Sequence, residues 1–409
     1  MTASLLRLTT ASVLALMAGT AYAQEASDIK FSGLLNAGIT ATNHSPESNT
    51  NFGHLLTDKN DQVVLNQLML TAQKDLDPKA TGYDWGFKAQ GFYGSDARYT
   101  HFIGIFDHNP DARNQFDITE ANLQGHMPHL FEGGVDAKLG LFTTPMGAEV
   151  IPANGNTFYS HSYIFNFGLP YKHTGLLTTS HVSPMVDVYL GVDTGVNTTI
   201  GDRGDNNDRI SGMAGLGLNL LNGDLTLLGL AHFGPEDPSR GPNGSPNANH
   251  TARTIGDITA IYKATDQLTL TTELNYIKDD LNHAQGYGVA QYGVYAVNEW
   301  LSLAARGEVF WDPNHFFVAA FPGNRDFVNV ERGQLTEKNV IIPGTRATYG
   351  ALTLGATLKP QGLPAQVDGM MIRPEVRYDR TLTDTNAFND LQNRDQWSFA
   401  VDLVLPVSF

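Results

Sequence analysis

The last thirteen residues of the chain alternate between apolar and mostly small or polar side chains. In steps of two from the C-terminus, every position is apolar: Phe409, Val407, Leu405, Leu403, Val401, Phe399 and Trp397. Successive side chains of a β-strand point to opposite faces, so the segment predicts a strand with one apolar and one polar face. Strands of soluble proteins usually have about five or six residues, whereas a tilted transmembrane strand needs roughly 9–11. The length favours a strand that crosses a bilayer, with a soluble sandwich as the alternative.

The same alternation recurs along the chain, for example over residues 83–93, 186–192, 268–276 and 352–358. Its phase is weaker near 62–74, 116–127 and 174–183, where strands are placed by spacing. Short connections alternate with long ones, which is typical of outer-membrane barrels. We therefore predict an all-β fold: a transmembrane antiparallel up-and-down β-barrel of about 16 strands, with short periplasmic turns and long extracellular loops. Counts of 14 or 18 strands stay open.

The N-terminus has the parts of a cleaved secretory signal. Arg7 precedes an apolar stretch over 8–19, and Ala21-Tyr22-Ala23 matches a signal-peptidase site. The sequence predicts a signal peptide at 1–23 and a single barrel domain at 24–409. The expected location is the cell outer membrane, as a multi-pass β-barrel exported through the periplasm.

Composition excludes several classes of function. A formal net charge of −16 argues against nucleic-acid binding, and the absence of cysteine excludes zinc-cysteine sites and thiol nucleophiles. The 13 histidines are not spaced as metal ligands, so no metal site is predicted. The acidic loop 202–208 is expected to be a solvated turn, with calcium binding left open. Ser160-His161 and Ser180-His181 would face opposite ways on a strand, so an enzyme is not predicted and no cofactor is expected.

If the apolar set faces lipid, the alternate charged set faces the interior. Barrels of about 16 strands enclose water, which these charges require. The better-phased strands place six basic and ten acidic residues inside, and this excess predicts a modest preference for cations. The candidate pore-lining residues are Lys88, Asp136, Lys138, Arg306, Glu308, Arg373, Glu375, Arg377 and Asp379. The same charges could instead form ion pairs that stiffen the barrel.

The third long loop, 143–173, is unusually aromatic and is unlikely to lie wholly in water. We predict that it narrows the pore. Its candidate constriction residues are Glu149, Phe158, Tyr159, His161, Tyr163 and Phe165. Packing against the barrel rim or a neighbouring subunit is the alternative.

Four segments resemble the OmpL-like β-barrel porins of Gram-negative bacteria: FTTPMGAEV at 142–150, FYSHSYIFNFGLPYKHTG at 158–175, VDTGVNTTIGDRGDNND at 192–208 and RPEVRYD at 373–379. The resemblance implies an outer-membrane porin. In sixteen-stranded porins the third external loop folds inward, which is the position of 143–173. This loop lacks the Pro-Glu-Phe-Gly-Gly pattern of enterobacterial general porins, so their pore geometry is not carried over.

We therefore expect a channel for passive diffusion of small hydrophilic solutes or ions, weakly preferring cations. The alternatives are a non-conducting barrel used for adhesion or structure and, less favoured, a barrel hydrolase. The expected partners are outer-membrane lipid and lipopolysaccharide, the outer-membrane assembly machinery through Phe409, small solutes and a homotrimer of the chain. No nucleic-acid partner is expected.

Overall fold

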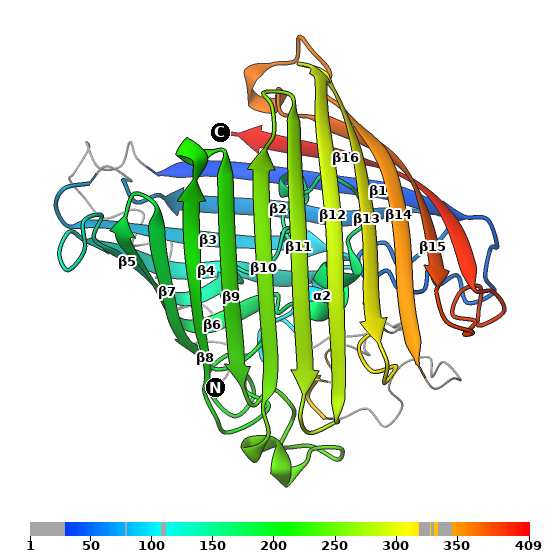
Figure 1. Ribbon diagram of the computed structural model, residues 1–409, viewed down its shortest axis with the longest axis horizontal. Coiled ribbons are helices and arrows are strands. Elements are labelled where there is room, and N and C mark those ends of the chain that lie inside the picture. Colours follow the sequence, from blue (N-terminus) through cyan, green and yellow to red (C-terminus); the bar gives the residue numbers. More distant parts are fainter. Residues whose placement is uncertain (1–28, 78–79, 108–111, 319–327, 329–330, 334–345) are drawn as a thin grey trace, which may run out of the picture.

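The chain forms a closed barrel of sixteen antiparallel strands in the computed structural model (Figure 1). The structure describes residues 29–77, 80–107, 112–318, 328, 331–333 and 346–409. Each strand pairs with its neighbours in sequence, and β1 pairs with β16 to close the barrel. The predicted up-and-down barrel and its strand number are confirmed. The predicted signal peptide, 1–23, lies outside the described residues.

The strands are β1 (Lys30–Thr42), β2 (Gln62–Lys74), β3 (Asp84–Gly94), β4 (Gln115–Met127), β5 (Val135–Thr143), β6 (Lys172–Ser183), β7 (Val186–Asp193), β8 (Ser211–Leu220), β9 (Leu225–Gly234), β10 (Arg253–Lys263), β11 (Leu268–Asp279), β12 (Ala284–Asn298), β13 (Leu301–Asp312), β14 (Ala347–Leu358), β15 (Met371–Thr381) and β16 (Asp395–Ser408). The short helical turns are α2 (Ala97–Thr100), η2 (Ala153–Gly155), η3 (Ile164–Gly168), η4 (Leu221–Gly223), η5 (Pro246–His250) and η6 (Ala365–Val367). None of the described helices is long and apolar enough to cross a membrane.

The long connections all lie at one end of the barrel. We number the connections at this loop end L1 (43–61), L2 (95–114), L3 (144–171), L4 (194–210), L5 (235–252), L6 (280–283), L7 (313–346) and L8 (382–394). The opposite end carries turns that are mostly short, with the connection 359–370 as the longest of them. This asymmetry matches the predicted arrangement of extracellular loops and periplasmic turns.

The C-terminal strand behaves as its sequence pattern predicts. It pairs with β1 from Ser32 opposite Ser408 to Thr42 opposite Ser398. Trp397 and Phe399 are about half exposed on the outer surface, whereas Ser398 and Asp402 are buried on the inner side. The barrel therefore presents its apolar face outward, as a lipid-facing wall requires.

The phase of β12 is the reverse of the one that grouping Tyr292, Val294 and Ala296 as the outward set would give. The sequence pattern groups Tyr292 with the outward apolar set, but the structure buries it inside the barrel, where its hydroxyl donates to Glu149. Tyr287, Val289 and Tyr295 are the exposed outer residues of this strand. Apolar residues stand on both faces of β12, so alternation alone does not set its phase.

If the outward face contacts lipid, the free-energy cost of a charged side chain on it should depend on depth in the membrane. Leu352 lies at the middle of β14 and is half exposed, while Leu358 lies on the same face at the end of the strand. We expect Leu352→Arg to lower the free energy of unfolding in lipid vesicles by about 2–4 kcal/mol, and Leu358→Arg by about 0–1 kcal/mol. Reversible denaturant titration in vesicles measures both values. Equal costs at the two positions would contradict the lipid-facing assignment.

Candidate pore constriction

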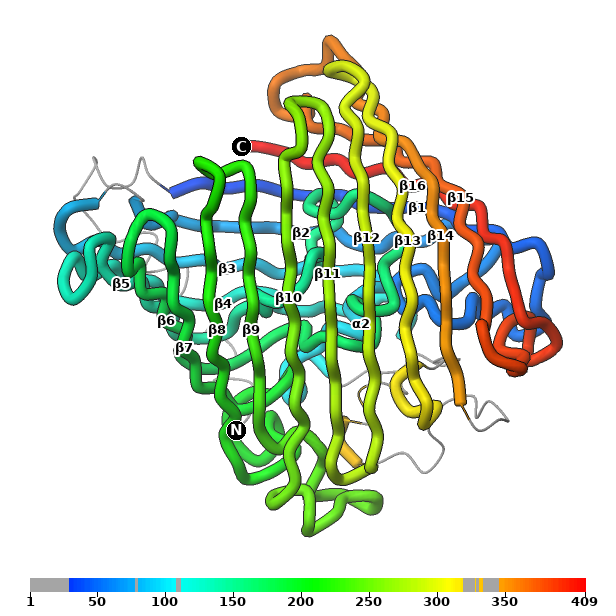
Figure 2. The backbone as a smooth tube through the Cα atoms, viewed as in Figure 1, coloured from blue at the N-terminus to red at the C-terminus, as the bar shows by residue number. Residues whose placement is uncertain are grey.

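Loop L3 folds into the barrel instead of extending from its end. Its η3 turn contacts β11 and β12, and its η2 turn contacts β16, so the loop crosses from β5 to the far wall (Figure 2). The predicted constriction residues are all at most 8% exposed: Glu149, Phe158, Tyr159, His161, Tyr163 and Phe165. The loop therefore occupies the barrel interior, the position that its aromatic content predicts.

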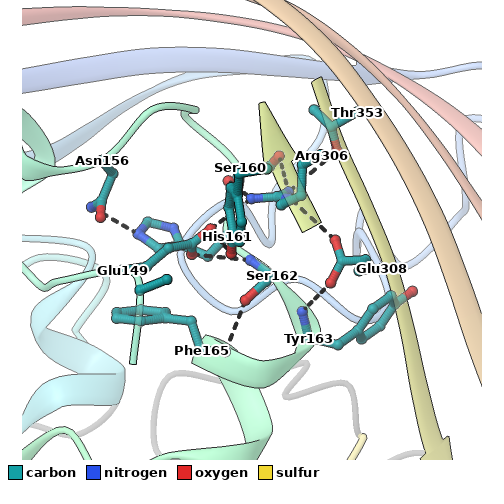
Figure 3. Close-up of polar contacts among 12 residues, drawn as sticks. Glu149, Asn156, Ser160, His161, Ser162, Tyr163, Phe165, Arg306, Glu308 and Thr353 are labelled. Atoms are coloured by element: carbon teal, nitrogen blue, oxygen red, sulfur yellow. Dashed lines mark hydrogen bonds and ion pairs between the residues drawn. The ribbon is translucent and has the colours of Figure 1, made fainter. Parts of the chain in front are cut away.

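Carboxylates of the far wall bind backbone N–H groups of L3. Glu375 on β15 accepts from the backbone N–H of Tyr159 at 2.9 Å and of Ser160 at 3.1 Å. Glu308 on β13 accepts from the backbone N–H of Tyr163 at 2.6 Å (Figure 3). These contacts satisfy donors that a buried loop could not otherwise pair, because it lacks regular secondary structure.

Arginines of the same wall bind backbone carbonyl groups of L3. Arg306 on β13 donates to the Ser160 carbonyl at 2.9 Å and to the Glu149 carboxylate at 2.7 Å (Figure 3). Arg377 on β15 donates to the His161 carbonyl at 3.0 Å. The wall thus supplies both donors and acceptors to one loop, which accounts for its alternating charges.

A third arginine extends these contacts toward the turn end. Arg373 donates to the carbonyl groups of Ala153 at 3.0 Å and Asn156 at 2.6 Å, and its guanidinium pairs with Asp402 on β16. Asp379 accepts from the Tyr163 hydroxyl at 3.0 Å and binds Arg377. Every charged residue of this cluster contacts either L3 or another member of the cluster.

The predicted pore-lining residues fall into two groups. Six face inward and are at most 8% exposed beneath L3: Arg306, Glu308, Arg373, Glu375, Arg377 and Asp379. The other three are half-buried on the opposite wall: Lys88, Lys138 and Asp136. Lys88 lies 3.6 Å from Glu120, and Asp136 contacts His126 and His181. The structure brings the first six together around L3 and leaves the last three apart from it.

Glycines of the barrel wall make room for L3 side chains. A Cβ atom added at Gly38 on β1 would lie 2.5 Å from the Tyr159 ring, and one at Gly355 on β14 would lie 3.0 Å from the Phe158 ring. Both distances are closer than carbon atoms normally approach. Sequence reasoning missed these positions, because a glycine carries no signal of which side chain from a distant loop will lie against it.

L1 and L2 also fold inward, which sequence reasoning did not predict. Phe52 and Leu55 of L1 pack in the same apolar cluster as Tyr163 of L3. Arg98 of α2 donates to both oxygens of Asp58, at 2.8 and 2.6 Å. Burial alone would raise the pKa of Asp58, but the Arg98 guanidinium lowers it below its ordinary value. The sequence of L1 gives no signal of this, because the partners of its residues lie in other loops.

Two weaker motifs take structural roles. The Ser160 hydroxyl binds Arg306 at 3.1 Å and the His161 ring binds Asn156 at 3.2 Å, so the two residues do not form a dyad. Arg240 of L5 contacts the carboxylates of Asp202 and Asp208 in the 202–208 loop. A basic side chain therefore stands beside the acidic groups that calcium would need.

The chain belongs to the family described as "Putative beta-barrel porin-2, OmpL-like", whose profile matches residues 28–407. Family and fold together define an outer-membrane channel of the porin class. No curated protein sequence matches the chain.

Solved porin structures share the fold at low sequence identity. The outer membrane channel DcaP of Acinetobacter baumannii is 12% identical, with 93% of this chain and 97% of that chain covered and a TM-score of 0.53. An anion-selective porin from Comamonas acidovorans is 10% identical, with 93% and 99% covered and a TM-score of 0.56. The trimer form of OmpT from Vibrio cholerae is 11% identical, with 92% and 98% covered and a TM-score of 0.51.

Displacing Tyr159 should release L3 from the wall. Because the chain has no cysteine, Ser162→Cys places a single thiol in the buried part of L3. We expect Gly38→Val in this background to speed thiol labelling about tenfold or more, since overpacking costs about 1–3 kcal/mol. Gly33→Val on the same strand is the control, because a Cβ there meets only ordinary contacts at 3.6 Å. Equal labelling in both variants would show that Tyr159 does not hold the loop.

Acid should also loosen L3. Burial lowers the pKa of His161 well below its ordinary value, and the guanidinium groups of Arg306, Arg373 and Arg377, with His54, lower it further. As the pH falls, His161 therefore binds a proton at a higher pH in the undocked loop than in the docked loop. The free energy of docking is fully present above about pH 6.5, and it falls by up to about 1.4 kcal/mol for each pH unit below that. We expect single-channel conductance to rise on acidification and His161→Gln to reduce that rise. An identical acid response in the variant would assign the effect to other groups.

Proposed function

We propose that the protein is a passive diffusion channel for small hydrophilic solutes, with L3 as its constriction. The observation that carries the proposal is the placement of L3 across the interior, held by both its N–H and its carbonyl groups. Cavities flank the loop on either side. One of about 160 Å³ is lined by Phe167 of L3 and Glu236 of L5, and one of about 220 Å³ is lined by Pro152 of L3 and Ser408.

The two groups of inward charges have different roles in this proposal. The six buried wall residues fix the position of L3, which sets the size of solute that passes. The half-buried Lys88, Lys138 and Asp136 stand clear of L3 and meet the permeating solute. Both interpretations of the inward charges, ion pairing and pore lining, then apply, but to different residues.

The channel proposal is tested by conductance in planar bilayers. Replacing residues 147–168 by a short Gly-Ser linker should raise single-channel conductance, because the backbone that crosses the lumen is removed. Removing the exposed tip 241–247 of L5 is the matched control and should leave conductance unchanged. Unchanged conductance without L3 would defeat the constriction. A wild-type barrel that conducts nothing would instead favour the non-conducting alternative, and esterase and protease assays would then test for a hydrolase.

A weak cation preference is supported by carboxylates on the wall away from the arginines. Asp257 on β10 and Glu273 on β11 are buried on the inner face and form no ion pair within the described part of the chain. Glu273 accepts from the Ala148 N–H at 3.1 Å, and its second oxygen has no hydrogen bond among the described residues. Acidic groups therefore outnumber basic partners on this part of the inner face.

We expect a reversal potential in a KCl gradient that indicates modest cation preference. Asp257→Asn together with Glu273→Gln should shift it toward zero, because the two substitutions remove inner-face carboxyl groups that have no basic partner among the described residues. Asp266→Asn, on a fully exposed turn position, is the control and should not shift it. A reversal potential of the opposite sign in the wild type would overturn the cation preference.

The remaining proposals concern export and assembly. We propose that residues 1–23 are removed during passage through the periplasm and that the barrel then sits among lipid and lipopolysaccharide. The 80% exposure of Phe409 supports its recognition by the assembly machinery. A homotrimer is supported by one fold neighbour that has a trimer form.

A further inference from the structure

Three side chains with metal-binding atoms meet at the loop end of the barrel. His173 lies near the start of β6, Asp193 is the last residue of β7, and His232 lies near the end of β9. Their ligand atoms all lie within 4.8 Å of one another, and the three side chains are at most 1% exposed. This cluster is separate from the L3 contacts on β13 and β15.

The distances suit a small divalent ion. Nδ1 of His173 is 3.4 Å from Oδ2 of Asp193, and Nε2 of His232 is 3.2 Å from the same oxygen and 3.1 Å from Oδ1. Two ligand atoms each about 2.0–2.2 Å from a tetrahedral zinc ion stand roughly 3.4 Å apart. Both histidine nitrogens therefore lie at about this spacing from Asp193, and all three ligand atoms lie within 4.8 Å of one another.

The remaining atoms of the histidines are oriented as outer partners of a metal site. Nε2 of His173 lies 3.3 Å from the Thr144 hydroxyl, which leaves Nδ1 to face Asp193, and this buried Nδ1 makes no hydrogen bond with any described residue. Nδ1 of His232 lies 3.7 Å from Glu236. Metal-bound histidines commonly hydrogen-bond their second nitrogen to a hydroxyl or carboxylate, and Thr144 takes this position at His173, whereas Glu236 lies beyond hydrogen-bond distance of His232.

The carboxylates are held in place by the loop backbone. Asp193 accepts from the Gly195 N–H at 2.8 Å, and Glu236 accepts from the Val196 N–H at 2.6 Å and from the Ser211 hydroxyl at 2.8 Å. These hydrogen bonds hold the two carboxylates in position without a bound ion. A packed set of donors with fixed orientation favours metal binding because little order is lost when the ion enters.

We propose that His173, Asp193 and His232 bind a divalent transition-metal ion, with zinc as the ion best matched to two imidazoles and one carboxylate. Three protein ligands leave one tetrahedral position for a water molecule. The ion would join β6, β7 and β9 where L3 ends and L4 and L5 begin, next to Thr144, Gly195 and Glu236. Glu236 also lines the cavity of about 160 Å³, which provides a route to the site.

The test measures zinc bound to the whole barrel purified in detergent. After chelation and dialysis against zinc, we expect about one ion per chain in the wild type, and at least tenfold weaker binding in His232→Ala and Asp193→Asn. Glu236→Gln, which removes only an outer partner, should weaken binding about 10–100-fold. His181→Ala is the matched control, because His181 also contacts aspartates, on the turn end of the same wall, and it should bind zinc as the wild type does.

Two readouts make the result decisive even if a variant fails to fold. Cobalt bound to the wild type should show the intense visible absorption of tetrahedral coordination, and zinc should raise the wild-type unfolding temperature, reversed by a chelator. Weak octahedral cobalt absorption, zinc retained in Asp193→Asn, or an equal loss in His181→Ala would each overturn the site. In that case the cluster is a carboxylate hydrogen-bonded between two histidines.

Discussion

The interior of the barrel depends on the pairing of L3 backbone groups with charges on β13 and β15. A loop buried inside a barrel has no neighbouring strand to satisfy its N–H and carbonyl groups, and each unpaired group costs free energy. Four charged side chains on the inner face of two strands supply those partners: Arg306 and Glu308 on β13, and Glu375 and Arg377 on β15. The arginines and carboxylates also neutralise one another, so the wall can carry high charge density while remaining almost wholly buried.

The close fit of L3 has consequences for the rest of the wall. Aromatic side chains lie against inward positions that lack a side chain, such as Gly38 and Gly355, so the loop reaches the wall without displacing strands. L1 and L2 pack in the same apolar cluster as Tyr163 of L3 through Phe52 and Tyr99, and the Asp58–Arg98 pair joins L1 to L2. The constriction is a set of three interlocked loops, in which L3 makes the contacts with Glu308 and Glu375 and L1 adds a contact between His54 and Asp379.

Much of the architecture could be predicted from the sequence. The period-two alternation predicted the strands, and the lengths of the connections predicted which end carries the loops. The aromatic run in 143–173 predicted a buried loop. Tyr292 is the instructive failure: β12 has apolar residues on both faces, so the side that packs against L3 cannot be distinguished from the side that faces outward. The inward packing of L1 and L2 was not predictable either, because Asp58 and Arg98 are partners only once two loops meet.

The sequence by itself determined that the chain forms a barrel, where its strands lie and that the aromatic loop 143–173 enters it. These follow from local rules, since alternation and loop length are read within one segment. The tertiary structure decided which charges meet. Glu375 binds the backbone of Tyr159, and His173, Asp193 and His232 converge although they lie on separate strands. Such contacts depend on barrel closure and on the register between strands, which are set by pairing across the whole sheet.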